Sequence, residues 1–197
     1  MISSQRDRLP ARASAMVRIQ PEGGAMVPFS CQITWDRNSC RFVGMSDLGG
    51  IMFLARSSLR EDDYRIDIVR NKTPWQAEDL KLVLAAVELT LIHPWVFSAH
   101  HFLPESDGEW LCRQYVPTSS LPNLLIESRV RKNFEVRSTT VYAAAMFSGY
   151  REILRVAVSS HAQTRHAGLP DAIHVRGSSP AVDFNAILVQ YKPRTNP

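Results

Sequence analysis

Hydrophobic and polar residues alternate strictly from Phe29 to Trp35. A period of two places successive side chains on opposite faces of a β-strand, so this segment predicts a strand with one buried face. Turn-forming residues follow at 36–39, and the apolar segment 40–44 predicts the returning strand of a hairpin. Similar patterns over 51–55 and 64–69 extend the predicted meander.

The period changes to three and four residues after Thr73. Thr73 precedes Pro74, and Gln76 stands three positions after the threonine, which together provide a capping residue, a proline at the first helical position and a reciprocal capping partner. We therefore predict a helix from Thr73 to Ile92, ended by Pro94. Its apolar positions are Leu80, Val83, Leu84, Val87 and Leu91, with Glu78, Lys81 and Glu88 mostly on the other side.

The strand pattern resumes after an irregular or short helical segment expected over 93–102. Strands are predicted over 109–115, 124–129, 134–137, 141–146, 153–159, 172–176 and 184–191. Several strands, one helix and several more strands predict a β-rich α+β fold: a curved antiparallel sheet, or incomplete barrel, with one amphipathic helix packed in or across its mouth. Residues 1–27 are expected to be poorly ordered or extended, with at most a short strand at 17–20, and 28–193 to form a single domain.

The composition adds limits to this picture. The 23 Lys and Arg against 19 Asp and Glu leave a net charge of +4 that is spread along the chain, so no nucleic-acid partner is expected. The three cysteines fit neither a disulfide framework nor a structural zinc site. No segment reaches membrane-spanning length or follows a signal-peptide pattern, so as written the chain is expected to be soluble and cytoplasmic.

No linear motif places a nucleophile beside a base. His93, His100 and His101 lie near Glu105 and Asp107, but their spacing matches no zinc pattern, so we expect neither a metal nor another cofactor. Tight turns explain the glycines Gly44, Gly49 and Gly50.

The more positive signal is a surplus of large apolar residues. Bulky side chains on the concave face of a curved sheet, beside a helix with a wide apolar stripe, can enclose a cavity for a hydrophobic ligand. The alternative for any one of these residues is an ordinary filled core. The candidate lining consists of Trp35, Phe42, Phe53, Ile66, Ile68, Leu84, Val87 and Leu188.

Three segments resemble the LolB-like outer-membrane lipoproteins. They are the leucine-glycine turn within 43–53, the helix 73–92 with Pro94-Trp95 after it, and the C-terminal hairpin that begins at 168–175. The resemblance implies a half-barrel with a helical lid that holds the acyl chains of a lipid or lipoprotein without catalysis. It also implies that Leu48 contacts membrane or cargo, and that the protein is periplasmic or outer-membrane associated.

Two functions of different kinds follow. The first is non-enzymatic binding or transfer of a hydrophobic ligand, with the acyl chains of a lipid or lipoprotein as the expected partner and a membrane surface as a further candidate. The second is an enzyme acting on an acyl or polyketide-like substrate, with His100, His101 or Asp107 at the cavity mouth. An interaction module that uses a sheet edge or the basic strand near Arg131 is a further alternative.

Overall fold

A computed structural model of the chain describes residues 12–23, 27–60, 63–92, 100–105, 108–131, 136–145, 149–160, 169–178 and 181–193. Twelve strands form one antiparallel sheet in the order β5-β4-β3-β2-β1-β12-β11-β10-β9-β8-β7-β6. The strands are β1 (Ala13–Pro21), β2 (Phe29–Trp35), β3 (Ser39–Ser46), β4 (Ile51–Leu59), β5 (Tyr64–Asn71), β6 (His100–Pro104), β7 (Glu109–Val116), β8 (Leu124–Arg131), β9 (Val136–Ala145), β10 (Gly149–Ser160), β11 (Ala172–Ser178) and β12 (Ala181–Pro193).

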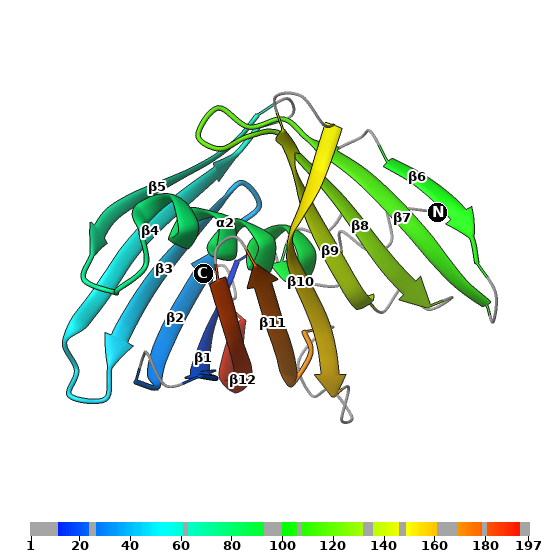
Figure 1. Ribbon diagram of the computed structural model, residues 1–197. Helices are drawn as coiled ribbons and strands as arrows, with labels where there is room; N and C mark the ends of the chain where they lie inside the picture. Colours follow the sequence, from blue (N-terminus) through cyan, green and yellow to red (C-terminus); the bar gives the residue numbers. More distant parts are fainter. Residues whose placement is uncertain are drawn as a thin grey trace.

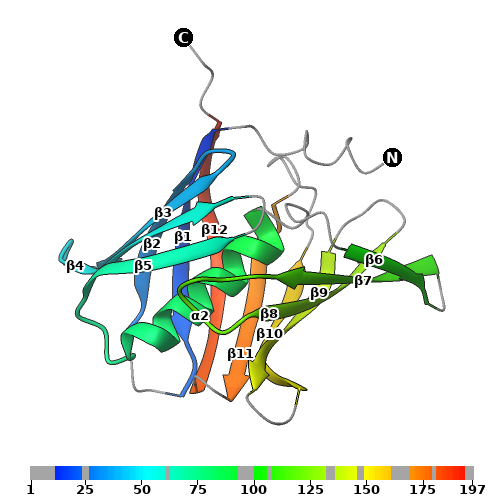
Figure 2. The ribbon, with the colours of Figure 1, turned by 90° about the horizontal axis from the view of Figure 1, so that it is seen from above.

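The sheet is strongly curved and open, and the helical segment lies across its concave face (Figure 1). Helix α2 (Ala77–Val87) continues into a π-helical segment, η1 (Glu88–Ile92). Figure 2 shows this helix inside the curve of the sheet. The predicted fold class is therefore confirmed: an antiparallel incomplete barrel with one helix in its mouth.

The two halves of the sheet meet at one rim. The connection between β7 and β8 reaches edge strand β5, where the backbone N–H of Tyr64 donates to the carbonyl of Pro117 at 2.9 Å. The N–H of Ile66 donates to the hydroxyl of Ser120, also at 2.9 Å. These bonds satisfy backbone groups that an edge strand would otherwise expose.

Burial alternates along the strands as their sequences require. In β2 every second residue is buried, beginning with Phe29. In β5, Tyr64 and Ile66 are buried while Arg65 and Asp67 are exposed, as the pattern of polar residues predicts. The buried side chains of the sheet and helix form one large core cluster between them.

Three strand predictions are corrected. Strand β1 has nine residues where at most a short strand was expected, and it pairs with both β2 and β12 near the middle of the sheet. Strand β6 occupies part of the segment expected to be irregular or helical. Residues 136–145 form one strand instead of parts of two. The predicted residues 134, 135 and 146 lie outside the described part of the chain.

The helix begins later than predicted. Its first residue is Ala77 and its N-cap is Gln76, whose side chain makes no capping hydrogen bond. The side chain of Thr73 is used in the turn before the helix, because its hydroxyl donates to Asn71 Oδ1 at 2.7 Å and accepts from the N–H of Trp75 at 3.3 Å. The capping-box interpretation is therefore wrong, although a helix does follow.

Glu88 is buried, although the helical pattern placed it on the polar side. Its side chain has no exposed surface. The hydroxyl of Ser57 donates to one carboxylate oxygen at 2.7 Å, and the hydroxyl of Tyr64 donates to the other at 2.9 Å. Glu88 begins the π-helical segment, where an i→i+5 pattern departs from the 3.6-residue period on which the prediction depended.

Burial and the neighbouring Glu88 carboxylate raise the pKa of the Tyr64 phenol well above its usual value. The phenol therefore stays protonated and continues to donate its hydrogen bond. The hydroxyl of Ser57 also accepts from the backbone N–H of Cys40 at 3.0 Å, so Ser57 links β3, β4 and η1. The hydrogen bonds among Ser57, Tyr64 and Glu88 therefore fix the end of the helical segment to one half of the sheet.

Substituting Ser57→Ala should lower the free energy of unfolding by about 1–3 kcal/mol, because a buried carboxylate oxygen and a buried backbone N–H both lose a partner. The measurement is urea unfolding followed by circular dichroism. The matched control is Ser58→Ala on the exposed face of the same strand, which should change stability by less than about 0.5 kcal/mol. If both substitutions lower the free energy of unfolding equally, the hydrogen bonds that Ser57 makes with Glu88 and Cys40 do not stabilise the fold.

Candidate functional site: an apolar cavity between sheet and helix

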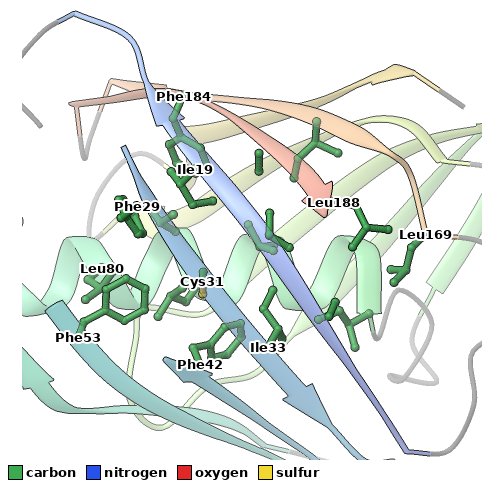
Figure 3. A pocket seen from close by; sticks show the side chains of 18 of the residues that line it. Ile19, Phe29, Cys31, Ile33, Phe42, Phe53, Leu80, Leu169, Phe184 and Leu188 are labelled. Atoms are coloured by element: carbon green, nitrogen blue, oxygen red, sulfur yellow. The ribbon is translucent and has the colours of Figure 1, made fainter. Parts of the chain in front are cut away.

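A cavity of about 80 Å³ lies between the concave face of the sheet and helix α2. Figure 3 shows labelled side chains from several strands of the sheet, among them Phe29, Phe42 and Phe184, spread around this space next to the helix. Its wall is formed by Ala15, Val17, Ile19, Phe29, Cys31, Ile33, Trp35, Phe42, Phe53, Trp75, Leu80, Val83, Leu84, Val87, Ile92, Leu169, Pro170, Ile173, Phe184, Ala186 and Leu188.

The wall follows directly from strand alternation. Strand β2 contributes every second residue along its whole length, from Phe29 to Trp35. The paired strand β1 contributes Ala15, Val17 and Ile19 in the same way. Helix α2 contributes the apolar stripe that begins at Leu80. The residues that line the cavity therefore include the inward-facing side chains of β2 and one face of the helix.

The structure brings six of the eight predicted lining residues together at this cavity: Trp35, Phe42, Phe53, Leu84, Val87 and Leu188. Ile66 and Ile68 do not line it. Both lie on β5, Ile66 fully buried and Ile68 half-buried against the core cluster. Strand β5 lies against helix α2. That any of these residues contacts a ligand stays a prediction.

Sequence reasoning missed the contribution of β1 and of the residues around Leu169. The alternation of Ala13, Ala15, Val17 and Ile19 with more polar residues was available as a signal, but the surrounding polar, proline and glycine residues concealed it. A bulge at Met16 and Val17 also shifts the pairing with β12.

Gly44 is required by packing, and the tight-turn interpretation is wrong for it. It lies within β3 opposite Phe53, and a Cβ atom at this position would stand 2.2 Å from the nearest ring carbon of Phe53. The ring of Phe53 also meets that of Phe29 edge to face, with centroids 5.9 Å apart. Gly49, with a φ of 78°, does serve the β3–β4 turn.

Cys31 is the sole ionisable side chain in the described wall of the cavity. Burial raises the pKa of its thiol to about 12. The thiol is therefore protonated at neutral pH, and it behaves as a small apolar group more than as a nucleophile. No imidazole or carboxylate belongs to this wall among the residues the structure describes.

The candidate polar residues lie elsewhere. His101 is exposed on β6, whereas His93, Asp107 and the side chain of His100 lie outside the described residues. On the convex face, the side chains of Glu22, His174 and Asp183 form a surface cluster whose potential ligand atoms lie within 4.8 Å of one another. His174 Nε2 hydrogen-bonds Asp183 Oδ1 at 2.6 Å, and Glu22 accepts from Asn185, so hydrogen bonds account for the arrangement.

Leu48 is at the tip of the β3–β4 hairpin, and 99% of its surface is exposed. It makes no part of the cavity wall. The hydroxyl of Ser46 accepts from the N–H of Gly50 at 3.1 Å, which helps to fix the turn that presents the leucine. The structure thus places Leu48 where a contact with a surface is sterically open.

The comparisons with known proteins concern the fold. No family model matches the chain, and no curated protein matches it. Three solved structures are similar in fold to this chain, which has a LolA-like half-barrel fold.

The first of these is a LolA superfamily protein from Nitrosomonas europaea, with 10% identity and a TM-score of 0.55 over 97% of this chain and 89% of that one. The second is a putative outer membrane lipoprotein-sorting protein domain from Vibrio parahaemolyticus, with 7% identity and a TM-score of 0.64 over 100% and 92% of the chains. The third is a DUF1329 family protein from Desulfovibrio piger, with 10% identity and a TM-score of 0.58 over 98% of this chain and 90% of that one.

Among the described residues, no helix has both the length and the apolar character needed to cross a membrane.

Substituting Gly44→Ala should lower the free energy of unfolding by about 1–3 kcal/mol, because the new Cβ displaces the Phe53 ring within a packed wall. Urea unfolding measures the loss. Gly50→Ala is the control, since the nearest atom its Cβ would meet is the Ser46 hydroxyl at 3.3 Å. If Gly44→Ala lowers the free energy of unfolding no more than Gly50→Ala does, the ring of Phe53 does not pack closely on Gly44 in the folded protein.

Proposed function

We propose that this protein binds a hydrophobic ligand without catalysis, and that it holds and transfers the acyl chains of a lipid or lipoprotein. The observation that carries the proposal is the cavity between sheet and helix, whose described wall is almost entirely apolar. Its lining residues include Trp35, Phe42, Leu84 and Leu188, which we propose as direct ligand contacts.

An empty apolar cavity is unfavourable in a protein core. Interiors are normally packed to the density of organic crystals, and a void deprives the surrounding atoms of dispersion contacts. A hydrocarbon chain that enters the cavity restores these contacts and leaves water at the same time. The cavity of about 80 Å³ has room for roughly five to eight groups the size of a water molecule, each of which takes up roughly 10–15 Å³. The cavity thus suits a segment of a single acyl chain.

The finer assignment is to a LolB-like function in the cell envelope. It is supported by the exposed Leu48 at the tip of a hairpin, which we propose as a contact with a membrane or cargo, and by the likeness of the fold to a putative outer membrane lipoprotein-sorting domain. Binding is preferred over catalysis on an acyl substrate, because the described wall places no acid or base beside the cavity.

Substituting Ala186→Leu should weaken the binding of a fluorescent long-chain fatty acyl probe by roughly ten-fold or more, a loss of about 1.4 kcal/mol. Ala186 lines the cavity, and a leucine there occupies part of the ligand's space. The same substitution should leave the protein as stable as before, or more stable by about 0.5–2 kcal/mol, because it fills a void. Fluorescence titration and urea unfolding measure the two effects.

The matched control is Ala181→Leu, at an exposed position of the same strand, which should leave probe affinity unchanged. An ordinary filled core would give a different result: no probe binding by the unaltered protein, and a loss of stability in Ala186→Leu from overpacking. That pair of results would refute the proposed function.

Substituting Leu48→Glu should slow transfer of the bound probe to lipid vesicles while leaving both affinity and stability nearly unchanged. The reason is that Leu48 contacts neither the core nor the cavity, so a charge there disfavours only its approach to an apolar surface. Stopped-flow energy transfer to labelled vesicles measures the rate. Val189→Glu, at another largely exposed apolar position on β12, is the control and should transfer at the original rate. Equal rates for Leu48→Glu and the unaltered protein would remove Leu48 from the mechanism.

A further inference from the structure

Three arginines on the outward face of β3, β4 and β5 have no acidic partner. The three strands together contain four arginines and one aspartate, and all five side chains are exposed. The aspartate is already engaged, because the Nε–H of Arg65 donates to Asp67 at 2.9 Å. Within the described part of the chain, the side chains of Arg41, Arg56 and Arg70 form no ion pair and no hydrogen bond. Their positive charges are therefore uncompensated.

Arginines in the other half of the sheet are paired with acids. The Nε–H of Arg113 donates to Glu127 at 2.6 Å, and the guanidinium of Arg155 donates to Glu152 at 3.0 Å. Cations that are spread along the sequence are thus neutralised at these positions of β7–β10 and left unpaired on β3–β5.

Two of the unpaired cations stand next to each other. Arg41 of β3 and Arg56 of β4 are directly opposite in the register of the two strands. Like charges at directly opposite positions destabilise a pair of strands. An anion between the guanidinium groups removes this repulsion, and guanidinium groups match the geometry of phosphate oxygens. The pair is therefore well suited to contact a phosphate group.

The same outward face becomes apolar toward the hairpin tip. Val43 of β3 and Leu54 of β4 are also opposite each other, two residues closer to the turn than the two arginines. Both alternate with buried neighbours, so they point away from the core, and both remain partly exposed. The outward face therefore presents apolar side chains beside the cations.

Exposed apolar side chains gather where the β3–β4 turn meets the end of β5. The exposed fractions are 99% for Leu48, 42% for Ile51 and 59% for Val69. The backbone N–H of Lys72 donates to the carbonyl of Met52 at 2.6 Å, so the end of β5 lies beside the start of β4. Figure 1 shows the turn and the end of β5 on the same side of the sheet. We call Leu48, Ile51 and Val69 the apolar corner.

A bilayer with anionic headgroups matches both parts of this surface. Apolar side chains at the boundary between headgroups and acyl chains leave water, while basic residues at the headgroup level are attracted to the negative surface. A nucleic acid would neutralise the arginines but would leave the apolar corner in water. Charge and hydrophobicity together therefore favour a lipid surface.

We propose that the outward face of β3–β5 docks on an anionic phospholipid bilayer, with the apolar corner at the edge of the acyl region and Arg41 and Arg56 against lipid phosphates. This inference rests on the proposed function in one respect, because the membrane contact proposed for Leu48 becomes part of a larger docking surface. Docking in this way sets the hairpin that lines the cavity against the bilayer.

The test measures co-flotation of the full chain with vesicles of phosphatidylcholine alone and with mixed vesicles of phosphatidylcholine and phosphatidylglycerol. The protein should bind the mixed vesicles more tightly by roughly ten-fold or more, because only these attract the unpaired arginines. Raising the salt concentration to about 0.5 M should remove most of this preference, because salt screens exposed charges.

In the double variant Arg41→Gln with Arg56→Gln, affinity for the mixed vesicles should fall roughly 10–30-fold, because two basic residues are lost from the bilayer surface. The matched control is Arg113→Gln with Arg155→Gln, which removes the same charge from exposed positions on the other half of the sheet. Its affinity should change by less than about three-fold, because charges farther than a Debye length from the bilayer are screened. Circular dichroism checks that each variant is folded, and the salt titration of the unaltered protein requires no variant.

Three outcomes would overturn the inference: equal losses in the two double variants, equal affinity for neutral and mixed vesicles, and no binding to either. In the last case, binding of polyglutamate to this face would assign it to an acidic protein partner. Affinity for the fluorescent acyl probe is measured separately on the same proteins. Probe binding without vesicle binding would remove the docking surface and leave the ligand-binding function intact. Vesicle binding without probe binding would support docking and refute the acyl-binding function.

Discussion

The concave face of the open sheet is apolar and must be shielded from water, and one short helical segment shields it. Helix α2 has eleven residues, a length at which an isolated helix is marginal in water. Its position therefore depends on tertiary contacts. The buried Glu88 carboxylate provides a fixed one, since the hydroxyls of Ser57 and Tyr64 donate to its two oxygens.

This attachment is made on strand β4, which also contributes a residue to the cavity wall. On strand β4, Phe53, Ala55 and Ser57 lie on the same concave face, and only Ser57 is polar. The helix end is held at Ser57, and Phe53 of the same strand lines the cavity. Loss of a buried carboxylate's partners is costly, which disfavours sliding of the helix toward the cavity. The space beside the helix can thus persist without being filled by rearrangement of the fold.

Strand alternation was enough to predict most of the sheet, but the predicted lining residues include only six of those that form the cavity wall. The pattern failed where local rules compete with tertiary structure. Residues 13–21 were predicted to contain at most a short strand. They form β1, which pairs with β2 and β12 near the centre of the sheet. Glu88 was predicted to be exposed to solvent because the prediction assumed a regular helical period. The π-helical segment breaks that period. Gly44 could not be distinguished from a turn glycine without knowing which ring lies across from it.

The β3–β4 hairpin joins the two parts of the proposed mechanism in one element. Phe42 and Phe53 enter the cavity from its two strands, and Leu48 stands fully exposed at its tip. Gly44 lets Phe53 lie flat against β3, so the hairpin can supply large rings to the cavity without being forced apart. In the proposed function, a contact made by Leu48 would be carried by the same hairpin that forms part of the cavity wall. The proposed surface contact and the proposed ligand contacts therefore lie on one continuous element, separated only by the length of two paired strands.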